Sequence, residues 1–333
     1  MRRRVDGDNR IGELVPISGT LLDGPGRAGQ HRDQATIDWN PVSHVSSLGY
    51  LVLSVTNLSD WESYLSGVFG LQSVSRPGGG RRFRMDEKTY RFDLVPGECD
   101  SIIAVGWEVA SSVDLERIVE RIEMAGIAVD RPDPQFVLDR GVSGLVRFKP
   151  AGADWWMELY YGLEEAQEPF ASPLGVTFVT GDMGLGHVLV AVSDEDYWRR
   201  LAEEILGLRL SDTIDLSHGT KPLAYFYHCN GRHHSLALAA RLPSGTAVGH
   251  VMIEVADLTT VGRAWDKVVD GAATITRTLG QHSNDKMTSF YARTPSIDGL
   301  RLEYGCNGLR VDDATWVVRR YTEPHYWGHR TPQ

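Results

Sequence analysis

The sequence contains one structural unit twice, and this duplication limits the folds that the chain can adopt. The segment GYLVLSVTNLSDWESYLSGVFGL, from Gly49, aligns without a gap with GHVLVAVSDEDYWRRLAEEILGL, from Gly186. In both copies an apolar run typical of a β-strand precedes a helical pattern that ends at a glycine, Gly70 or Gly207. Internal duplication of this kind identifies a building unit before any functional motif is considered.

Two further pairs of segments extend the repeat. WEVA at Trp107–Ala110 resembles IEVA at Ile253–Ala256, and each is followed by a helical pattern. ELYYG at Glu158–Gly162 resembles RLEYG at Arg301–Gly305 near the end of each half. The pattern predicts an α+β protein with two similar domains, each made of two strand-helix-strand-strand-strand (βαβββ) modules.

The composition along the chain predicts the domain boundaries. Residues 1–45 hold many glycine, aspartate, arginine and glutamine residues without an apolar period, which predicts a poorly ordered N-terminal tail. A strand is expected from Leu48. We expect one domain at residues 46–170 and a second at residues 180–333, which suits a chain of 333 residues.

Charge and composition argue against several classes of function. The formal net charge of -10 argues against a nucleic-acid partner, because phosphate binding relies on clustered Lys and Arg. No apolar run reaches transmembrane length and no secretory signal is recognisable, so we expect a cytoplasmic protein without a membrane partner. The cysteines, Cys99, Cys229 and Cys306, lack a CxxC spacing, and we interpret all three as buried thiols.

Histidine is distributed unevenly between the two copies. Of the 11 histidines, only two precede His187. The two leading strands of the second copy each carry one, His187 in GHVLVAV and His250 in GHVMIEV, where the first copy has Tyr50 and about Ala104. We therefore expect a metal site only in the C-terminal domain, with the N-terminal domain as a packing partner or oligomer contact.

Glu303 completes a candidate metal site with these two histidines. Its strand alternates apolar Leu302 and Tyr304 with charged residues, so Glu303 is expected to project from the middle of a sheet, where it needs a cation. Two imidazoles and one carboxylate are the set expected at a non-haem Fe(II) centre that keeps positions open for substrate and oxygen. A single histidine at a strand start is more often a buried structural side chain, and only the equivalent positions of His187 and His250 favour a metal.

Several segments of the second half resemble one enzyme family. They are GHVLVAV at Gly186–Val192, NGRHHSLA at Asn230–Ala237, GHVMIEVADL at Gly249–Leu258, HSNDKMTSFY at His282–Tyr291, EYG at Glu303–Gly305 and YWGHR at Tyr326–Arg330. In combination they resemble the type I extradiol catechol dioxygenases of the vicinal oxygen chelate superfamily, in particular the 2,3-dihydroxybiphenyl 1,2-dioxygenase group. The resemblance covers about Leu48 to Arg330. Two features depart from it: Ile297–Asp298 is inserted in a turn, and the tail has no counterpart.

The resemblance implies the vicinal oxygen chelate fold and a ring-opening iron enzyme. His187, His250 and Glu303 would bind Fe(II), and Mn(II) suits the same ligands. The expected substrates are O2 and a catechol, which would be cleaved beside its diol to a semialdehyde or keto acid. The resemblance also implies a homo-oligomer, commonly of eight subunits.

The resemblance further implies roles for His234, His282 and Tyr291. His234 would be the acid and base near the oxygen side, where it stabilises developing charge and supplies a proton. His282 and Tyr291 would act on the substrate hydroxyl oxygens. Asn284 and Asp285 are expected to contact the substrate and to orient His282, although a turn-forming Asn-Asp pair is an equally good interpretation.

An apolar pocket is expected beside these groups. Tyr225, Phe226 and Tyr227, with Leu236 and Leu238, are its predicted lining, although core packing explains some of them. The lining favours a bicyclic or alkyl-substituted catechol such as 2,3-dihydroxybiphenyl.

Two other classes of protein use the same paired-module fold. Metal-dependent isomerases or transferases have similar His and Glu ligands, and metal-free binding proteins sequester drugs. Neither class needs His234, His282 and Tyr291 together, which favours the dioxygenase.

Overall fold

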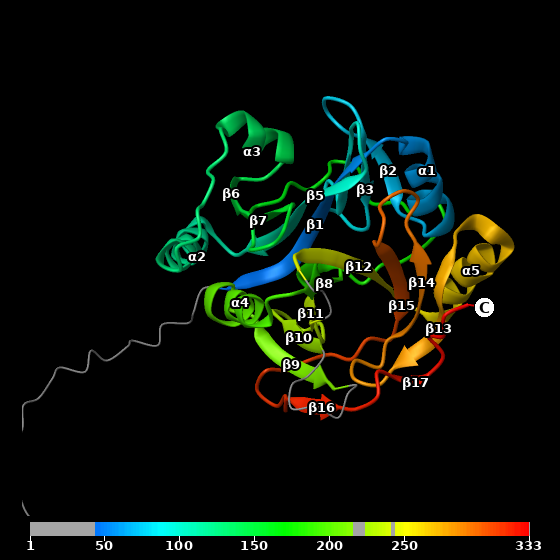
Figure 1. Cartoon of the computed structure of the whole chain (residues 1–333). Helices are drawn as coiled ribbons and strands as arrows, with labels where there is room; N and C mark the ends of the chain where they lie inside the picture. The colour runs from blue at the N-terminus through cyan, green and yellow to red at the C-terminus, as the bar shows by residue number, and fades with distance from the viewer. Residues whose placement is uncertain (1–43, 216–223, 241–243, 333) are drawn as a thin grey trace, which may run out of the picture. The chain divides into compact units, whose positions relative to one another are not determined.

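Two β-sheets with helices on them form the part of the chain described by the computed structural model, residues 44–215, 224–240 and 244–332 (Figure 1). The predicted tail at 1–45 falls outside this part except for its last two residues. Val45 already belongs to a strand, so regular structure begins before the predicted Leu48.

The first sheet contains the strands of two modules in the order β2-β3-β4-β1-β5-β7-β6. The first module comprises β1 (Val45–Val55), α1 (Leu58–Glu62), a π-helical turn η1 (Ser63–Val68), β2 (Gln72–Ser75), β3 (Arg81–Arg84) and β4 (Phe92–Pro96). The second comprises β5 (Ser101–Val109), α2 (Ser112–Met124), α3 (Pro134–Arg140), β6 (Gly144–Phe148) and β7 (Trp156–Tyr161). One strand predicted after α2 is reduced to an isolated bridge between Asp130 and Arg147.

The second sheet has the order β16-β9-β10-β11-β8-β12-β15-β14-β13-β17. After a short 3-10 turn, η2 (Gly181–Met183), its first module comprises β8 (His187–Val192), α4 (Glu195–Arg200), η3 (Leu201–Ile205), β9 (Arg209–Ile214), β10 (Ala224–His228) and β11 (Leu236–Ala240). Its second comprises β12 (Thr246–Val255), α5 (Leu258–Lys267), η4 (Val268–Ala272), β13 (Ile275–His282), β14 (Thr288–Arg293) and β15 (Arg301–Cys306). The edge strands are β16 (Arg319–Tyr321) and β17 (His325–Trp327).

The strand pairing repeats in all four modules. The first strand of each module pairs in parallel with the last strand of the same module, as in β8 with β11 and β12 with β15. The two leading strands of each sheet, β1 with β5 and β8 with β12, pair antiparallel at its centre. The predicted α+β class and paired-module fold are confirmed, and the pairing places β8, β12 and β15 side by side.

Local sequence starts the helices of these modules. Asn57 Oδ1 accepts a hydrogen bond from Ser59 N–H at 3.1 Å before α1, and Asp257 Oδ1 accepts one from Thr260 N–H at 2.9 Å before α5. Such N-caps satisfy backbone donors that have no partner inside the helix.

The core is continuous between the two sheets. Buried apolar residues of both form one cluster, and direct hydrogen bonds join the first and fourth modules. Tyr304 Oη donates to the backbone oxygen of Phe69 at 3.2 Å, and Trp61 Nε1 donates to Ser296 Oγ at 2.9 Å. The boundary between the predicted domains 46–170 and 180–333 stays a prediction.

The cysteines differ in part from the sequence interpretation. Cys229 and Cys306 are buried free thiols, as predicted, but Cys99 is exposed because it lies in the loop before β5.

No helix within the described ranges is long and apolar enough to span a membrane.

Candidate metal centre and active site

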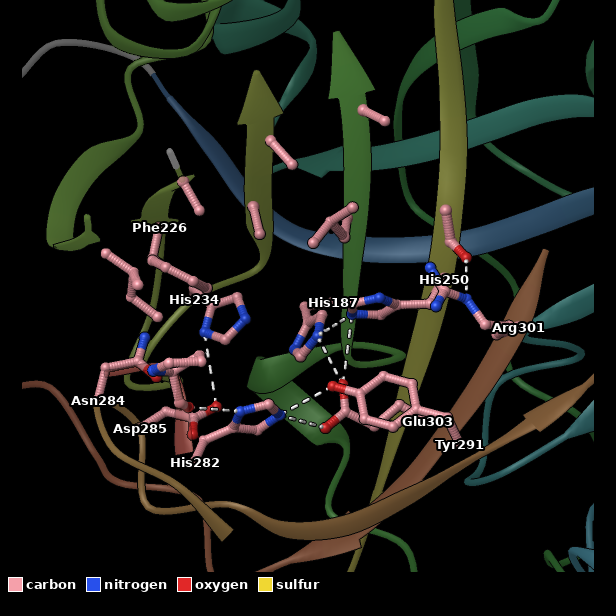
Figure 2. Close-up of a pocket in the computed structure, with 18 of the residues that line it drawn as sticks. His187, Phe226, His234, His250, His282, Asn284, Asp285, Tyr291, Arg301 and Glu303 are labelled. Atoms are coloured by element: carbon pink, nitrogen blue, oxygen red, sulfur yellow. Dashed lines mark hydrogen bonds and ion pairs between the residues drawn. The ribbon is translucent and has the colours of Figure 1, made fainter. Parts of the chain in front are cut away.

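The three predicted ligands lie on the adjacent central strands of the second sheet, His187 on β8, His250 on β12 and Glu303 on β15. Their side chains converge on one point (Figure 2). His187 Nε2 and His250 Nε2 are 3.0 Å apart, and each is 3.3 Å from Glu303 Oε2. All three residues are buried.

These separations fit one face of an octahedral ion. Ligand bonds of about 2.1 Å at right angles place neighbouring ligand atoms about 3.0 Å apart. Two imidazole nitrogens and one carboxylate oxygen are also the donor set of facial-triad iron sites. The residues present therefore fit a divalent transition-metal ion.

Local contacts hold this arrangement. Gly186, just before His187, has φ +154°, and a Cβ atom there would lie 1.9 Å from the backbone oxygen of Met252. Only glycine allows β8 and β12 to approach this closely. Ser289 Oγ donates to Glu303 Oε1 at 2.6 Å, which orients the carboxylate and leaves Oε2 facing the histidines.

The insertion Ile297–Asp298 does not disturb the site. Tyr291 and Glu303 are direct partners in the β14–β15 register. Ile297 is buried in the turn, where its backbone oxygen accepts hydrogen bonds from Thr294 Oγ1 at 3.2 Å and Leu300 N–H at 3.2 Å. The turn accommodates the extra residues away from the strands.

His282 and Tyr291 form a hydrogen-bonded pair beside the carboxylate. His282 Nε2 lies 2.8 Å from Tyr291 Oη and 3.3 Å from Glu303 Oε1. Burial lowers the pKa of His282, but the hydrogen bond and charge of Glu303 outweigh it and raise the pKa to about 9. Burial raises the pKa of Tyr291 well above its usual value, so its hydroxyl stays protonated. The pair can exchange a proton with a hydroxyl group in the cavity.

The backbone, and not the predicted Asn-Asp pair, orients His282. Its Nδ1 donates to the backbone oxygen of Pro324 at 3.1 Å. Asn284 Nδ2 is buried without a hydrogen-bond partner and lines the cavity, so it is an unpaired donor. Asp285 Oδ1 accepts from Met287 N–H at 3.0 Å, while Oδ2 lies 3.9 Å from His234 Nδ1. Asp285 therefore faces His234.

The His234 ring packs against the candidate ligand His187, with ring centroids 4.0 Å apart and planes tilted by 31°. Burial, with the neighbouring His187 and His233 rings, holds the pKa of His234 well below its usual value. The imidazole is therefore neutral at neutral pH and can accept a proton from a bound acid.

The predicted metal ligands and the predicted polar side chains all line one cavity of about 210 Å³ (Figure 2). Away from the ligands the cavity wall is apolar and built largely from small residues; it comprises Leu189, Ala191, Ile214, Ala224, Phe226, Ala237 and Ala239.

Of the predicted apolar lining, Phe226 alone faces this cavity. Side chains alternate along a strand, so Tyr225 and Tyr227 point to the opposite face of β10. There their hydroxyls donate to Glu195 Oε1 at 2.5 Å and Glu203 Oε1 at 2.7 Å. Leu236 and Leu238 pack in the main core for the same reason, and the intervening alanines line the cavity.

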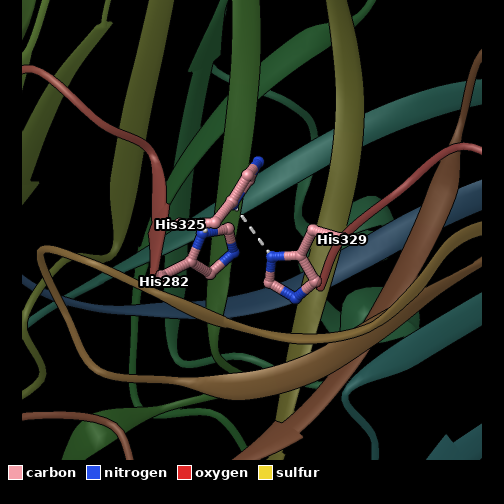
Figure 3. A group of neighbouring side chains, drawn as sticks. All are labelled: His282, His325 and His329. Carbon is pink, nitrogen blue, oxygen red and sulfur yellow. Dashed lines mark hydrogen bonds between the residues drawn. The ribbon is translucent and has the colours of Figure 1, made fainter. Parts of the chain in front are cut away.

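Two C-terminal histidines belong to the site region and were not predicted. His325 lines the cavity, and its Nδ1 is 3.0 Å from His329 Nδ1 (Figure 3). The rings of His282 and His329 have centroids 4.3 Å apart, and His329 Nε2 donates to the backbone oxygen of Ser289 at 2.9 Å. The histidine-rich segment Glu323–Arg330 was the available sequence signal.

The equivalent place in the first sheet is filled by aromatic rings. Tyr50, Ala104 and Tyr160, which align with the three candidate ligands, are buried in one apolar cluster. The Tyr50 and Tyr160 rings stack with centroids 4.7 Å apart, and Tyr50 Oη donates to Glu158 Oε2 at 2.7 Å. These aligned residues offer no imidazole or carboxylate ligands.

Protein-family models match both halves of the chain. Residues 184–304 match the Glyoxalase/Bleomycin resistance protein/Dioxygenase superfamily, and residues 48–97 match the model described as dihydroxybiphenyl dioxygenase BphC D1.

Curated relatives and solved structures agree with these matches. The chain is 41% identical to a biphenyl-2,3-diol 1,2-dioxygenase of Paraburkholderia xenovorans, over 86% of this chain and 96% of that protein. It is 33% identical to an iron-dependent extradiol dioxygenase of Rhodococcus jostii, over 86% and 97%. The crystal structure of BphC, a halotolerant catechol dioxygenase, superposes with a TM-score of 0.79 at 32% identity, over 86% of this chain and 95% of that one. With this similarity along nearly the whole length of its relatives, the chain belongs to the extradiol dioxygenase family within the Glyoxalase/Bleomycin resistance protein/Dioxygenase superfamily.

Proposed function

We propose that this chain is an Fe(II)-dependent extradiol dioxygenase that inserts O2 into a catechol beside its diol and yields a ring-opened semialdehyde or keto acid. The observation that carries the proposal is the facial spacing of His187 Nε2, His250 Nε2 and Glu303 Oε2, at 3.0 to 3.3 Å from one another. Three ligands on one face leave the opposite positions open for exogenous groups.

The cavity supports a bicyclic or alkyl-substituted catechol such as 2,3-dihydroxybiphenyl. Its polar groups gather at one end, and its apolar wall of alanine, leucine, isoleucine and phenylalanine side chains can contact a second ring. Relatives named as biphenyl-2,3-diol and 3-methylcatechol dioxygenases support the same class of substrate.

In this proposal side chains of the cavity bind the catechol and transfer its protons. Bound Fe(II) would supply a Lewis acid for the catecholate and a route for electrons between catecholate and O2. His282 and Tyr291 bind the catechol hydroxyl groups. Asn284 Nδ2, a buried donor without a partner among the protein atoms, donates a hydrogen bond to the substrate. His234 accepts a proton and later donates it to oxygen as the O–O bond breaks.

The test is ring cleavage by the reconstituted chain. We expect anaerobic loading with ferrous salt, followed by air and 2,3-dihydroxybiphenyl, to give a yellow ring-opened product. A metal-dependent isomerase or a binding protein of the same fold would give none. Parallel loading with Mn(II) decides whether manganese supports turnover.

Assembly into a homo-oligomer, commonly an octamer in proteins of this kind, is also part of the proposal. Tyr326 and Trp327 on the edge strand β17 are 59% and 50% exposed, which supports a contact surface at this edge. Size-exclusion chromatography with light scattering on the purified protein measures the number of subunits. The cytoplasmic location stays a prediction.

A further inference from the structure

A line of buried hydrogen bonds leads from His234 away from the cavity. His234 Nδ1 lies 3.1 Å from His233 Nδ1, and His233 Nε2 lies 2.7 Å from Asp212 Oδ2. The three residues are 4%, 2% and 0% exposed, in that order. Among them only His234 lines the cavity. Asp212 and His233 can therefore act on a substrate only through His234.

The order of protons along this line follows from the Asp212 carboxylate, which can only accept. His233 Nε2–H donates to Asp212 Oδ2, so the lone pair of the His233 ring is left on Nδ1. His234 must then donate its Nδ1–H to that lone pair. Asp285 Oδ2, 3.9 Å from the same nitrogen, also favours a proton there. The lone pair of His234 is consequently left on Nε2.

We propose that Asp212 and His233 are positioning residues that hold His234 in the tautomer with a basic Nε2. This inference rests on the proposed function, in which His234 takes up a proton before it returns one. The catechol O–H bond breaks, its proton passes to His234 Nε2, and Nδ1–H stays bonded to His233. The Asp212 charge, transmitted through His233, then stabilises the imidazolium.

The pair is held rigidly enough for this role. Asp212 Oδ1 accepts from Arg319 N–H at 3.0 Å, so both carboxylate oxygens are engaged. Ser211 Oγ donates to the backbone oxygen of His233. The His233 and Trp316 rings pack in a T-shaped pair, with centroids 5.4 Å apart and planes at 80°. These contacts leave His233 little freedom to turn.

The substitution Asp212→Asn reverses the proton order with little change in shape. Arg319 N–H still needs an acceptor, so the amide oxygen faces it and the amide NH2 faces His233 Nε2. His233 must then accept at Nε2 and donate at Nδ1, which forces the proton of neutral His234 onto Nε2. We expect kcat on 2,3-dihydroxybiphenyl to fall about 10²- to 10⁴-fold. Iron content and anaerobic affinity for the catechol should change less than about twofold.

A readout without iron or turnover checks the tautomer directly. Long-range ¹H–¹⁵N spectra of the metal-free chain, labelled at histidine, should show a protonated Nδ1 at His234 in the wild type and a protonated Nε2 in Asp212→Asn. His234→Phe assigns the signals. Asp86→Asn is the matched control, because Asp86 accepts from Arg91 at 2.6 Å in the connection between β3 and β4, far from His234 in sequence, and should leave both spectrum and kcat unchanged.

A second pair of variants keeps the test decisive if Asp212→Asn does not fold. In His233→Asn the amide oxygen can replace Nδ1 as acceptor, so kcat should fall by less than about tenfold, whereas His233→Leu has no acceptor and should lose about 10²-fold or more. Equal losses in the two variants, or wild-type kcat and tautomer in Asp212→Asn, would overturn the inference. Equal falls in kcat, iron content and catechol affinity would assign a purely structural role and overturn it as well. If the wild-type chain still cleaves 2,3-dihydroxybiphenyl, these outcomes overturn only the positioning role of Asp212 and His233. If the wild-type chain does not cleave it, the proposed function and the positioning role are both overturned.

Discussion

At the scale of single residues, Glu303 links the candidate metal ligands to the proton-transfer groups. Its Oε2 faces His187 and His250, while Oε1 accepts from Ser289 and lies 3.3 Å from His282 Nε2. Burial alone raises the pKa of Glu303, but hydrogen bonds from His187 and His282 hold the pKa well below its usual range. The carboxylate is therefore ionised in a buried site, where a cation is its natural partner.

Glu303→Gln should weaken iron binding by more than about 100-fold, because even loss of a group that only orients a ligand costs about 10- to 100-fold. Ser289→Ala removes such an orienting hydrogen bond, so we expect it to weaken iron binding by about 10- to 100-fold. Iron titration with a competing chelator measures both. Equal affinities in wild type and Glu303→Gln would exclude Glu303 as a ligand.

His234→Phe should keep iron and anaerobic catechol binding but lower kcat about 10²- to 10⁴-fold, the usual contribution of general acid–base catalysis. Phe226 already packs on this ring at 4.9 Å between centroids, so an aromatic replacement suits the site. Steady-state and anaerobic binding measurements separate the two effects. Turnover at the wild-type rate would remove His234 from the chemistry.

At the scale of elements, strand period and register decide which residues reach the cavity. On β10, Phe226 faces the cavity while Tyr225 and Tyr227 face the opposite side, although all three are aromatic. On β14 and β15, the direct pairing of Tyr291 with Glu303 is kept because the inserted residues lie in the turn. The turn is therefore a stability element and not part of the chemistry.

Ile297→Ala should lower the free energy of unfolding by about 2–4 kcal/mol, since it removes a buried side chain that is 7% exposed. The neighbouring Asp298 is exposed, so Asp298→Ala should change the free energy of unfolding by less than about 0.5 kcal/mol. Urea unfolding measures both, and kcat per bound iron should be unchanged. A loss of kcat in folded Ile297→Ala would show that the turn contributes to the site.

At the scale of the whole described chain, the same pairing scheme occurs in both sheets but with different side chains at the equivalent positions. In the second sheet the leading strands contribute two imidazoles. In the first sheet the place is closed by stacked tyrosines over a buried pair in which Arg140 Nη2 donates to Glu158 Oε1 at 2.8 Å. One copy is thus packed as a core and the other is left with a cavity.

We expect one iron per chain, and no change in iron content or kcat in Tyr50→Phe. That variant loses a hydrogen bond to the charged Glu158 and should be less stable by about 1.5–3 kcal/mol. Tyr90→Phe, which loses a bond to the neutral backbone oxygen of Arg140, should cost about 0.5–1.5 kcal/mol. Metal analysis measures the iron content, and denaturant unfolding measures the two stability losses. Two irons per chain would contradict the conclusion that the first sheet holds no metal ligands at the equivalent positions.

Sequence alone was sufficient for the duplicated α+β fold, the family resemblance and the candidate ligands. The reason is that strand period, helix ends and equivalent positions in a repeat are local properties. His187 and His250 could be selected because the repeat aligns them with each other and with Tyr50 and Ala104.

Only the tertiary structure decided which atoms meet across distant segments. The bond from His282 to Pro324, the approach of His325 to the cavity and the line from His234 through His233 to Asp212 each depend on strand register and on where a loop returns. The exposure of Cys99 and the direction of the Tyr225 side chain, away from the cavity, also depend on the tertiary structure. Such contacts join residues with no fixed spacing in the chain, so periodicity carries no information about them.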